Sequence, residues 1–155
     1  MKYRTENEFE QFGFDETFVK DVEVGPDYFR IWLDNVKILP DNSCNRDIRT
    51  MRTNGLQLTI TDMKIVSFIR EGVKIYNADG VPMGSREDEV VAEEDYMDIF
   101  ALFLEGQAYC ITKEEGEKCV YTFVVDAKDE ATYEVKIAGS GEAEEWDRFM
   151  SLDAM

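Results

Sequence analysis

The chemistry open to this chain is limited by a missing residue type, since none of its 155 residues is histidine. Ser-His-Asp and Cys-His nucleophile systems are therefore excluded, as are iron, copper and zinc sites built on histidine ligands. Carboxylate acid–base catalysis, a lysine nucleophile and a metal held by oxygen ligands remain open. Because the chain has 34 acidic residues, neighbouring carboxylates arise by chance, and no pair stands out as catalytic. These observations favour a noncatalytic protein and indicate no cofactor and no metal site.

Three arginines, Arg46, Arg49 and Arg52, lie within seven positions and are opposed locally only by Asp47. On a helical turn, a spacing of three would place them on one face. Guanidinium groups match the oxygens of carboxylates and phosphates, so the cluster is a candidate site for a small anionic ligand. The alternative is that the arginines pair with acidic side chains of the same molecule.

A second charged segment is acidic and occupies twelve positions around Val90-Val91-Ala92. Its seven carboxylates are Glu87, Asp88, Glu89, Glu93, Glu94, Asp95 and Asp98. Such a cluster suits docking to a basic protein surface. The alternative is an exposed connector whose charges keep a β protein from pairing edge to edge with another chain.

Two short motifs resemble ligand loops but lack required residues. Asn77-Ala78-Asp79-Gly80 resembles part of a calcium loop, yet Ile75 stands where the first oxygen ligand is required. Gly139-Ser140-Gly141 resembles part of a dinucleotide fingerprint, but Glu144 takes the place of the third glycine. We therefore interpret the first as an ordinary turn and the second as the start of a helix.

The three cysteines, Cys44, Cys110 and Cys119, form no CxxC pair, which argues against a structural zinc site or a thioredoxin-like motif. A turn centred between Glu114 and Glu115 would put Cys110 and Cys119 opposite each other on neighbouring strands. They would then be either small reduced core residues or a cross-strand disulfide. With an odd cysteine count and no export signal, we expect reduced thiols and a cytoplasmic location.

The overall charge narrows the range of partners. Seventeen basic residues against 34 acidic ones leave a formal charge of -17, which repels phosphate backbones and anionic lipids. No apolar run follows the N-terminal residues as a signal peptide requires, and the longest run, residues 99–104, is far too short to cross a bilayer. We expect a soluble protein with no nucleic-acid or membrane partner. Residues 1–8 are expected to be flexible and residues 9–155 to form a single domain.

Short apolar runs separated by turn residues predict an antiparallel meander of about seven to eight strands. The alternation of apolar with polar residues is clearest in two places: at Leu56, Leu58 and Ile60, and at Tyr133, Val135 and Ile137. Residues 18–24 and 28–38 are expected to form one hairpin across Gly25-Pro26-Asp27. Residues 65–69 and 73–76 are expected to form another, and residues 99–104 a buried strand.

The closing segment, residues 141–153, is expected to be an amphipathic helix, because acidic residues precede apolar ones at helical spacing. Residues 119–139 followed by Glu144-Glu145-Trp146-Asp147-Arg148-Phe149 resemble the last hairpin and Trp-bearing helix of pleckstrin-homology-like domains. The resemblance covers about a quarter of the chain and implies a mainly β fold closed by a C-terminal helix. The family's phosphoinositide site uses basic residues in its first hairpin loop, where this chain has Gly25-Pro26-Asp27.

The predicted fold is therefore mainly β: a curved sheet or small barrel, pleckstrin-homology-like or calycin-like, with a C-terminal helix. The function that fits this fold and charge best is a noncatalytic protein-interaction module. The alternative is a binder of a small anionic ligand through the arginine cluster.

Overall fold

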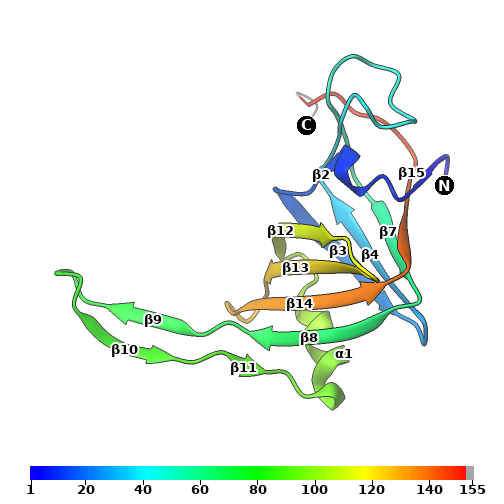
Figure 1. The fold of residues 1–155 in the computed structure, drawn as a ribbon. Coiled ribbons are helices and arrows are strands. Elements are labelled where there is room, and N and C mark those ends of the chain that lie inside the picture. The colour runs from blue at the N-terminus through cyan, green and yellow to red at the C-terminus, as the bar shows by residue number, and fades with distance from the viewer. Residues whose placement is uncertain (153–155) are drawn as a thin grey trace.

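The computed structural model describes residues 1–152 and is mostly β, as the sequence predicts (Figure 1). Its largest element is a bent antiparallel sheet of ten strands in the order β1-β15-β7-β4-β3-β12-β13-β14-β8-β11. In chain order these strands are β1 (Tyr3–Glu6), β3 (Thr17–Val24), β4 (Tyr28–Asp34), β7 (Leu56–Thr61), β8 (Lys64–Arg70), β11 (Glu89–Val90), β12 (Gln107–Glu114), β13 (Cys119–Asp126), β14 (Thr132–Gly139) and β15 (Gly141–Trp146). The sheet remains open, with β1 and β11 as its two edges, so the alternative of a closed barrel is wrong.

Two smaller sheets and three short helical segments complete the fold. The strands are β2 (Phe12–Gly13), β5 (Val36–Ile38) and β6 (Met51–Thr53) in one sheet, and β9 (Val73–Tyr76) and β10 (Pro82–Arg86) in the other. The helical segments are the 3-10 helices η1 (Phe9–Gln11) and η2 (Glu93–Asp95) and the α-helix α1 (Tyr96–Leu102).

The core follows from side chains that alternate along the strands. In β7, Leu56, Leu58 and Ile60 are fully buried while the residues between them are partly exposed, which confirms the predicted alternation. The same holds for Tyr133, Val135 and Ile137 in β14. Since successive strand side chains point to opposite faces, one face of the bent sheet encloses a single apolar core.

Aromatic rings close this core from two sides. Phe100 of α1 packs on Phe29 and Phe68, with ring centroids 5.5 Å and 5.0 Å apart. On the N-terminal side, Phe9 meets Tyr121 at 5.9 Å and Phe12 meets Trp146 at 5.5 Å. The helix and the N-terminal segment are thus both anchored by large rings, which dominate core burial.

Strands β9 and β10 form a ribbon that projects from the body (Figure 1). The expected hairpin between residues 65–69 and 73–76 is wrong, because β8 continues past Gly72 into β9, and β9 turns back as β10 at residues 77–81. A Cβ atom at Gly72 would lie only 2.0 Å from the carbonyl oxygen of Arg86. The segments around Gly72 and Arg86 therefore approach each other at a distance that only glycine allows. We call residues 73–86 the arm.

The predicted C-terminal helix over residues 141–153 is also wrong. Residues 141–146 form β15, which pairs with β1 on one side and β7 on the other, and residues 153–155 lie outside the described part of the chain. Glu142, Glu144 and Trp146 alternate with smaller or less buried residues, which is a strand period. The segment that carried the pleckstrin-homology-like resemblance therefore has no Trp-bearing helix.

Within residues 1–152 the single α-helix, α1, lies where a strand was expected. Tyr96, Ile99, Phe100 and Phe103 lie at helical spacing and face the core. This spacing is hard to see in the sequence because residues 99–104 are all apolar. The expected flexible terminus, residues 1–8, contains β1, which pairs with β15.

Candidate functional site

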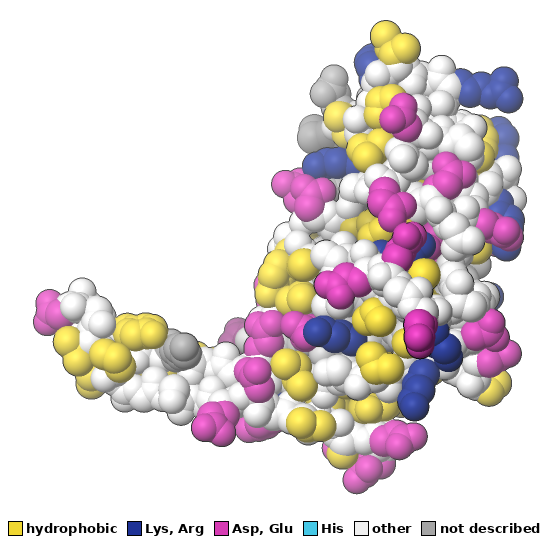
Figure 2. Space-filling model, viewed as in Figure 1, with side chains coloured by type: hydrophobic (Ala, Val, Ile, Leu, Met, Phe, Trp, Pro, Cys, Tyr) yellow, Lys and Arg dark blue, Asp and Glu magenta, His cyan; other side chains and the backbone are white. Residues whose placement is uncertain are grey.

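The seven acidic residues predicted to contact a partner lie together at one edge of the large sheet, where the arm joins the body. They occupy the end of the arm, the edge strand β11, η2 and the start of α1. All seven are exposed, and in the described part of the chain none forms an ion pair with lysine or arginine. Figure 2 shows acidic side chains around the base of the arm. We call residues 87–98 the acidic segment.

Part of this charge supports local structure. Glu93, Glu94 and Asp95 precede α1 and Asp98 lies in its first turn, where carboxylates interact favourably with the positive end of the helix dipole. The Asp88 carboxylate accepts a hydrogen bond of 2.6 Å from the backbone N–H of Gly72 and so fixes the base of the arm. The dipole does not explain Glu87 and Glu89, which extend the negative surface along the sheet edge.

The acidic segment borders a shallow recess of about 330 Å³. Its lining includes Glu89, Asp95 and Asp98 together with Arg70 and Tyr133. Tyr133 donates a 2.6 Å hydrogen bond to Asp129, and burial followed by this bond raises the pKa of its phenol to about 12. The recess therefore offers carboxylates, one guanidinium and a neutral ring, a surface suited to cationic side chains.

The three arginines are not stacked on a helix, because residues 40–50 form an irregular loop. The loop is organised by the buried Asn45, whose amide donates hydrogen bonds of 3.1 to 3.2 Å to the carbonyls of Ile38, Leu39 and Arg49. Arg49 forms a 3.1 Å ion pair with Asp47, as the alternative interpretation expects. Arg52 lies in β6 and forms a backbone bridge with Met150.

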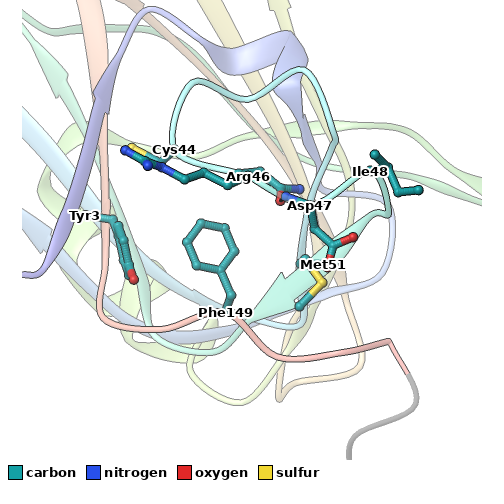
Figure 3. Close-up of a pocket in the computed structure, with 8 residues that line it drawn as sticks. Tyr3, Cys44, Arg46, Asp47, Ile48, Met51 and Phe149 are labelled. Carbon is teal, nitrogen blue, oxygen red and sulfur yellow. Dashed lines mark hydrogen bonds between the residues drawn. The ribbon is translucent and has the colours of Figure 1, made fainter.

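Arg49 lines a cavity of about 360 Å³ beside Met51, and Arg46 lines a larger one of about 640 Å³ (Figure 3). In this view the Arg46 side chain runs along the loop above the rings of Tyr3 and Phe149. Those two rings pack edge to face with centroids 4.8 Å apart, and Met51 adds an apolar wall. The larger cavity combines aromatic surface with one exposed guanidinium.

A polar cluster that the sequence analysis missed is buried beneath β15. The Glu142 carboxylate accepts hydrogen bonds from Lys113 Nζ at 2.6 Å and from the Tyr121 hydroxyl at 2.8 Å. Glu144 accepts one from the Thr5 hydroxyl at 2.7 Å. The side chains of Lys113 and Glu142 are only 3% and 0% exposed, and Glu144 is fully buried.

Burial sets the protonation of this cluster. Burial, then hydrogen bonding to Glu142 and its charge, raise the pKa of Glu144 well above its ordinary value. Burial opposes the charged form of Lys113, but the bond to Glu142 and its charge prevail and raise the pKa of that amine. Burial and the bond to Glu142 likewise raise the pKa of Tyr121. The raised pKa favours the protonated form of Glu144 beside the ion pair of Lys113 and Glu142.

One oxygen on each carboxyl group supports this assignment. Glu142 Oε2 and Glu144 Oε2 are both buried and have no hydrogen-bond partner among the described groups. A protonated Glu144 can donate a hydrogen bond to Glu142, which would give these buried oxygens a partner. The signal in the sequence is the period-two order of Glu142, Glu144 and Trp146, which is obscured because acidic residues followed by apolar ones at helical spacing also predict a helix.

All three cysteines are free thiols. In the β12–β13 hairpin Cys110 faces Val124, and Cys119 faces Gly139 of β14. The predicted opposition of Cys110 and Cys119 is wrong, because the turn is centred near residue 117 and the register separates them. No cross-strand disulfide forms in this register.

Within residues 1–152, no group of three or more cysteine or acidic side chains is placed to bind a metal ion. In that same range no helix has the length and apolar character needed to cross a membrane. No protein-family model, curated protein or solved structure matches the chain.

Proposed function

We propose that this protein is a noncatalytic interaction module that docks a basic protein surface on its acidic segment. The observation that carries the proposal is the exposure of all seven carboxylates at one sheet edge without an internal cationic partner. A negative patch of this kind accelerates encounter with a positive partner and excludes acidic ones. The recess beside it provides a place for a lysine or arginine side chain of the partner.

The test begins with capture from native lysate at low and high salt, with the bound proteins identified by mass spectrometry. The recovered protein is then titrated against wild type and a variant in which Glu93, Glu94, Asp95 and Asp98 become amides. We expect a slower association rate for the variant and a weaker dependence of that rate on salt.

A matched control changes the same charge elsewhere. Glu16, Asp41, Glu114 and Glu117 are exposed and form no ion pair within the described residues. Converting these four to amides changes the net charge equally. If both variants lose binding to the same extent, or no basic protein is retained at low salt, the acidic segment is not a docking surface.

A second candidate function is the binding of a small anionic ligand that carries an aromatic ring. It is favoured by the position of Arg46 above Tyr3 and Phe149, which pairs a cation with ring surface (Figure 3). Thermal-shift titrations with phosphate, nucleotides and dicarboxylates test it. We expect nucleotides to raise the melting temperature of wild type and of Arg49→Ala but not of Arg46→Ala, whereas identical curves for all three proteins would remove this function.

A further inference from the structure

The arm exposes an apolar surface that the body of the protein does not cover. Five of its side chains are 42% to 64% exposed: Val73, Ile75, Tyr76, Val81 and Met83. Figure 2 shows apolar side chains gathered at the end of the projection. Because side chains alternate along a strand, Val73 and Ile75 lie on one face of the ribbon and Tyr76 on the other, so the arm exposes apolar side chains on both faces.

A two-stranded ribbon is only marginally stable in water by itself. Each strand of the arm is paired on one side only, because β9 and β10 are the sole members of their sheet among the described residues. Both outer edges therefore carry unpaired backbone N–H and C=O groups. Open edges with apolar side chains favour pairing with another strand.

The form of the ribbon is set by its own turn. Asn77 Oδ1 accepts hydrogen bonds from the N–H groups of Asp79 and Val81, at 2.9 and 3.0 Å, and Asn77 N–H donates to the Val81 carbonyl at 3.0 Å. Ile75 lies opposite Gly84, so no side chain covers it from the neighbouring strand. Such a preorganised surface loses little entropy on binding.

Charge distinguishes the arm from the rest of the chain. Residues 73–86 contain Lys74 and Arg86 against Asp79, a net charge of +1, whereas the whole chain carries -17. Two copies would therefore repel each other body to body, and the arm is the part through which they approach at least cost.

We propose that the arm is a self-association element: two copies pair through their arms, side by side and antiparallel, about a twofold axis. Antiparallel pairing of identical edges is self-complementary, as twofold symmetry requires. The eight residues from Val73 to Gly80 span roughly 25 Å at about 3.3 Å per residue. Overlapped arms hold the bodies about that far apart, which is about three times the screening length of roughly 8 Å at physiological salt.

The surface area buried between two paired arms agrees with a reversible dimer. Side-by-side pairing makes the apolar side chains of the two arms neighbours on each face and leaves the faces themselves open, so the buried area falls below the roughly 1,000 Å² of a stable interface, as a weak dimer requires. The acidic segments lie at the arm bases, outside the paired strands, so the dimer presents two of them. This inference does not rest on the proposed function.

Sedimentation velocity across a concentration series tests the proposal. The arm variant is Ile75→Thr/Met83→Thr, which keeps strand-compatible residues while removing apolar area. The matched control, Ile48→Thr/Val66→Thr, alters two side chains that are 93% and 50% exposed outside the arm. We expect wild type and control to dimerise in the micromolar range and the arm variant to associate at least about tenfold more weakly. Amide hydrogen exchange over residues 73–86 should slow with increasing protein concentration in wild type and in the control, and should not slow in the arm variant.

Self-association and the docking of a basic protein should respond to salt in opposite ways, which distinguishes the two. Because screening lowers the repulsion between acidic bodies, self-association should strengthen between about 0.05 and 0.5 M NaCl, whereas docking to the acidic segment should weaken. Wild type that remains monomeric up to about 200 µM at both salts, or an arm variant that dimerises like the control, overturns the proposal. The arm variant should still bind the basic partner.

Discussion

At the scale of single residues, Glu142 and Glu144 are the most costly groups in the molecule. Both side chains lie in the interior, where an isolated carboxylate would lose several kcal/mol of hydration. Lys113 compensates Glu142 directly through a 2.6 Å ion pair. Glu144 forms no ion pair in the described residues, and its raised pKa favours the neutral acid.

Protonation of Glu144 makes stability depend on pH. Its folded-state pKa lies above the ordinary value of 4.5, so the folded protein binds more protons than the unfolded chain above that pH. The contribution is fully present below pH 4.5, declines as the pH rises and stops declining above the folded-state pKa. The decline is at most about 1.4 kcal/mol per pH unit.

Glu144→Gln should remove this dependence. The amide oxygen can still accept from Thr5 and the amide nitrogen can donate to Glu142, as the proton does in wild type. Relative to wild type, the variant should gain stability steadily from pH 5.5 to 8.5 in urea unfolding. Glu117→Gln, an exposed residue, is the control; a difference between Glu144→Gln and wild type that does not change with pH would contradict the protonated state.

The pair of Lys113 and Glu142 predicts a strong coupling between two mutations. Lys113→Met leaves the Glu142 carboxylate buried without its cation and should cost about 3 to 5 kcal/mol of unfolding free energy. Adding Glu142→Gln removes the uncompensated charge, so the double variant should recover most of that loss. Chemical denaturation of both single variants and the double variant measures the coupling, and simple additivity would show that the two groups act independently.

At the scale of elements, the loop 39–50 is held by one side chain rather than by regular structure. Asn45 is 8% exposed, donates to three carbonyl groups and accepts from the N–H of Asp47. Asn45→Ala leaves those carbonyls unsatisfied and should cost about 1 to 3 kcal/mol. Amide exchange should accelerate in residues 39–50, and a variant with unchanged protection there would contradict this role. Asn54→Ala is the comparison, since Asn54 Oδ1 caps a neighbouring turn outside the loop.

Elements whose hydrophobic period was clear could be predicted from the sequence. The alternation in β7 and β14 gave both strands and their buried residues, and Gly25-Pro26-Asp27 gave the β3–β4 hairpin. Two predictions of secondary structure were wrong: the segment that forms α1 was expected to be a strand, and the segment that forms β15 was expected to be a helix. An apolar run buried on all sides hides its period, and paired glutamates in a core contradict the rule that charged residues lie outside.

The candidate sites were predicted unevenly for related reasons. The acidic segment is a continuous exposed stretch because its residues are adjacent in sequence, and its role as a docking site stays a prediction. The sequence predicts one cluster of arginines, but Arg46 and Arg49 line different cavities and Arg49 forms an ion pair with Asp47. The buried cluster joins Thr5, Lys113, Tyr121 and β15, which are far apart in sequence, so only the paired strands bring it together.

At the scale of the whole molecule, the charge of -17 predicts that salt stabilises the folded state. Exposed carboxylates without partners repel one another, and folding brings them closer together than the unfolded chain does. Screening relieves this repulsion over a length of about 30 Å at 0.01 M salt and about 10 Å at 0.1 M. The melting temperature should therefore rise by several degrees between these limits, about 2 to 4 °C for each kcal/mol gained.

This effect must be separated from association, which also raises the melting temperature with salt if the arms pair. Measurement at low concentration in the Ile75→Thr/Met83→Thr background leaves the charge unchanged and removes the apolar contact.

Conversion of all seven acids in the acidic segment to amides reduces the net charge from -17 to -10. That protein should show a clearly smaller salt-induced rise, because seven of the mutually repelling charges are gone. An equal rise would mean that the repulsion arises elsewhere on the surface, and a fall with salt in the arm variant would mean that its charges are net stabilising.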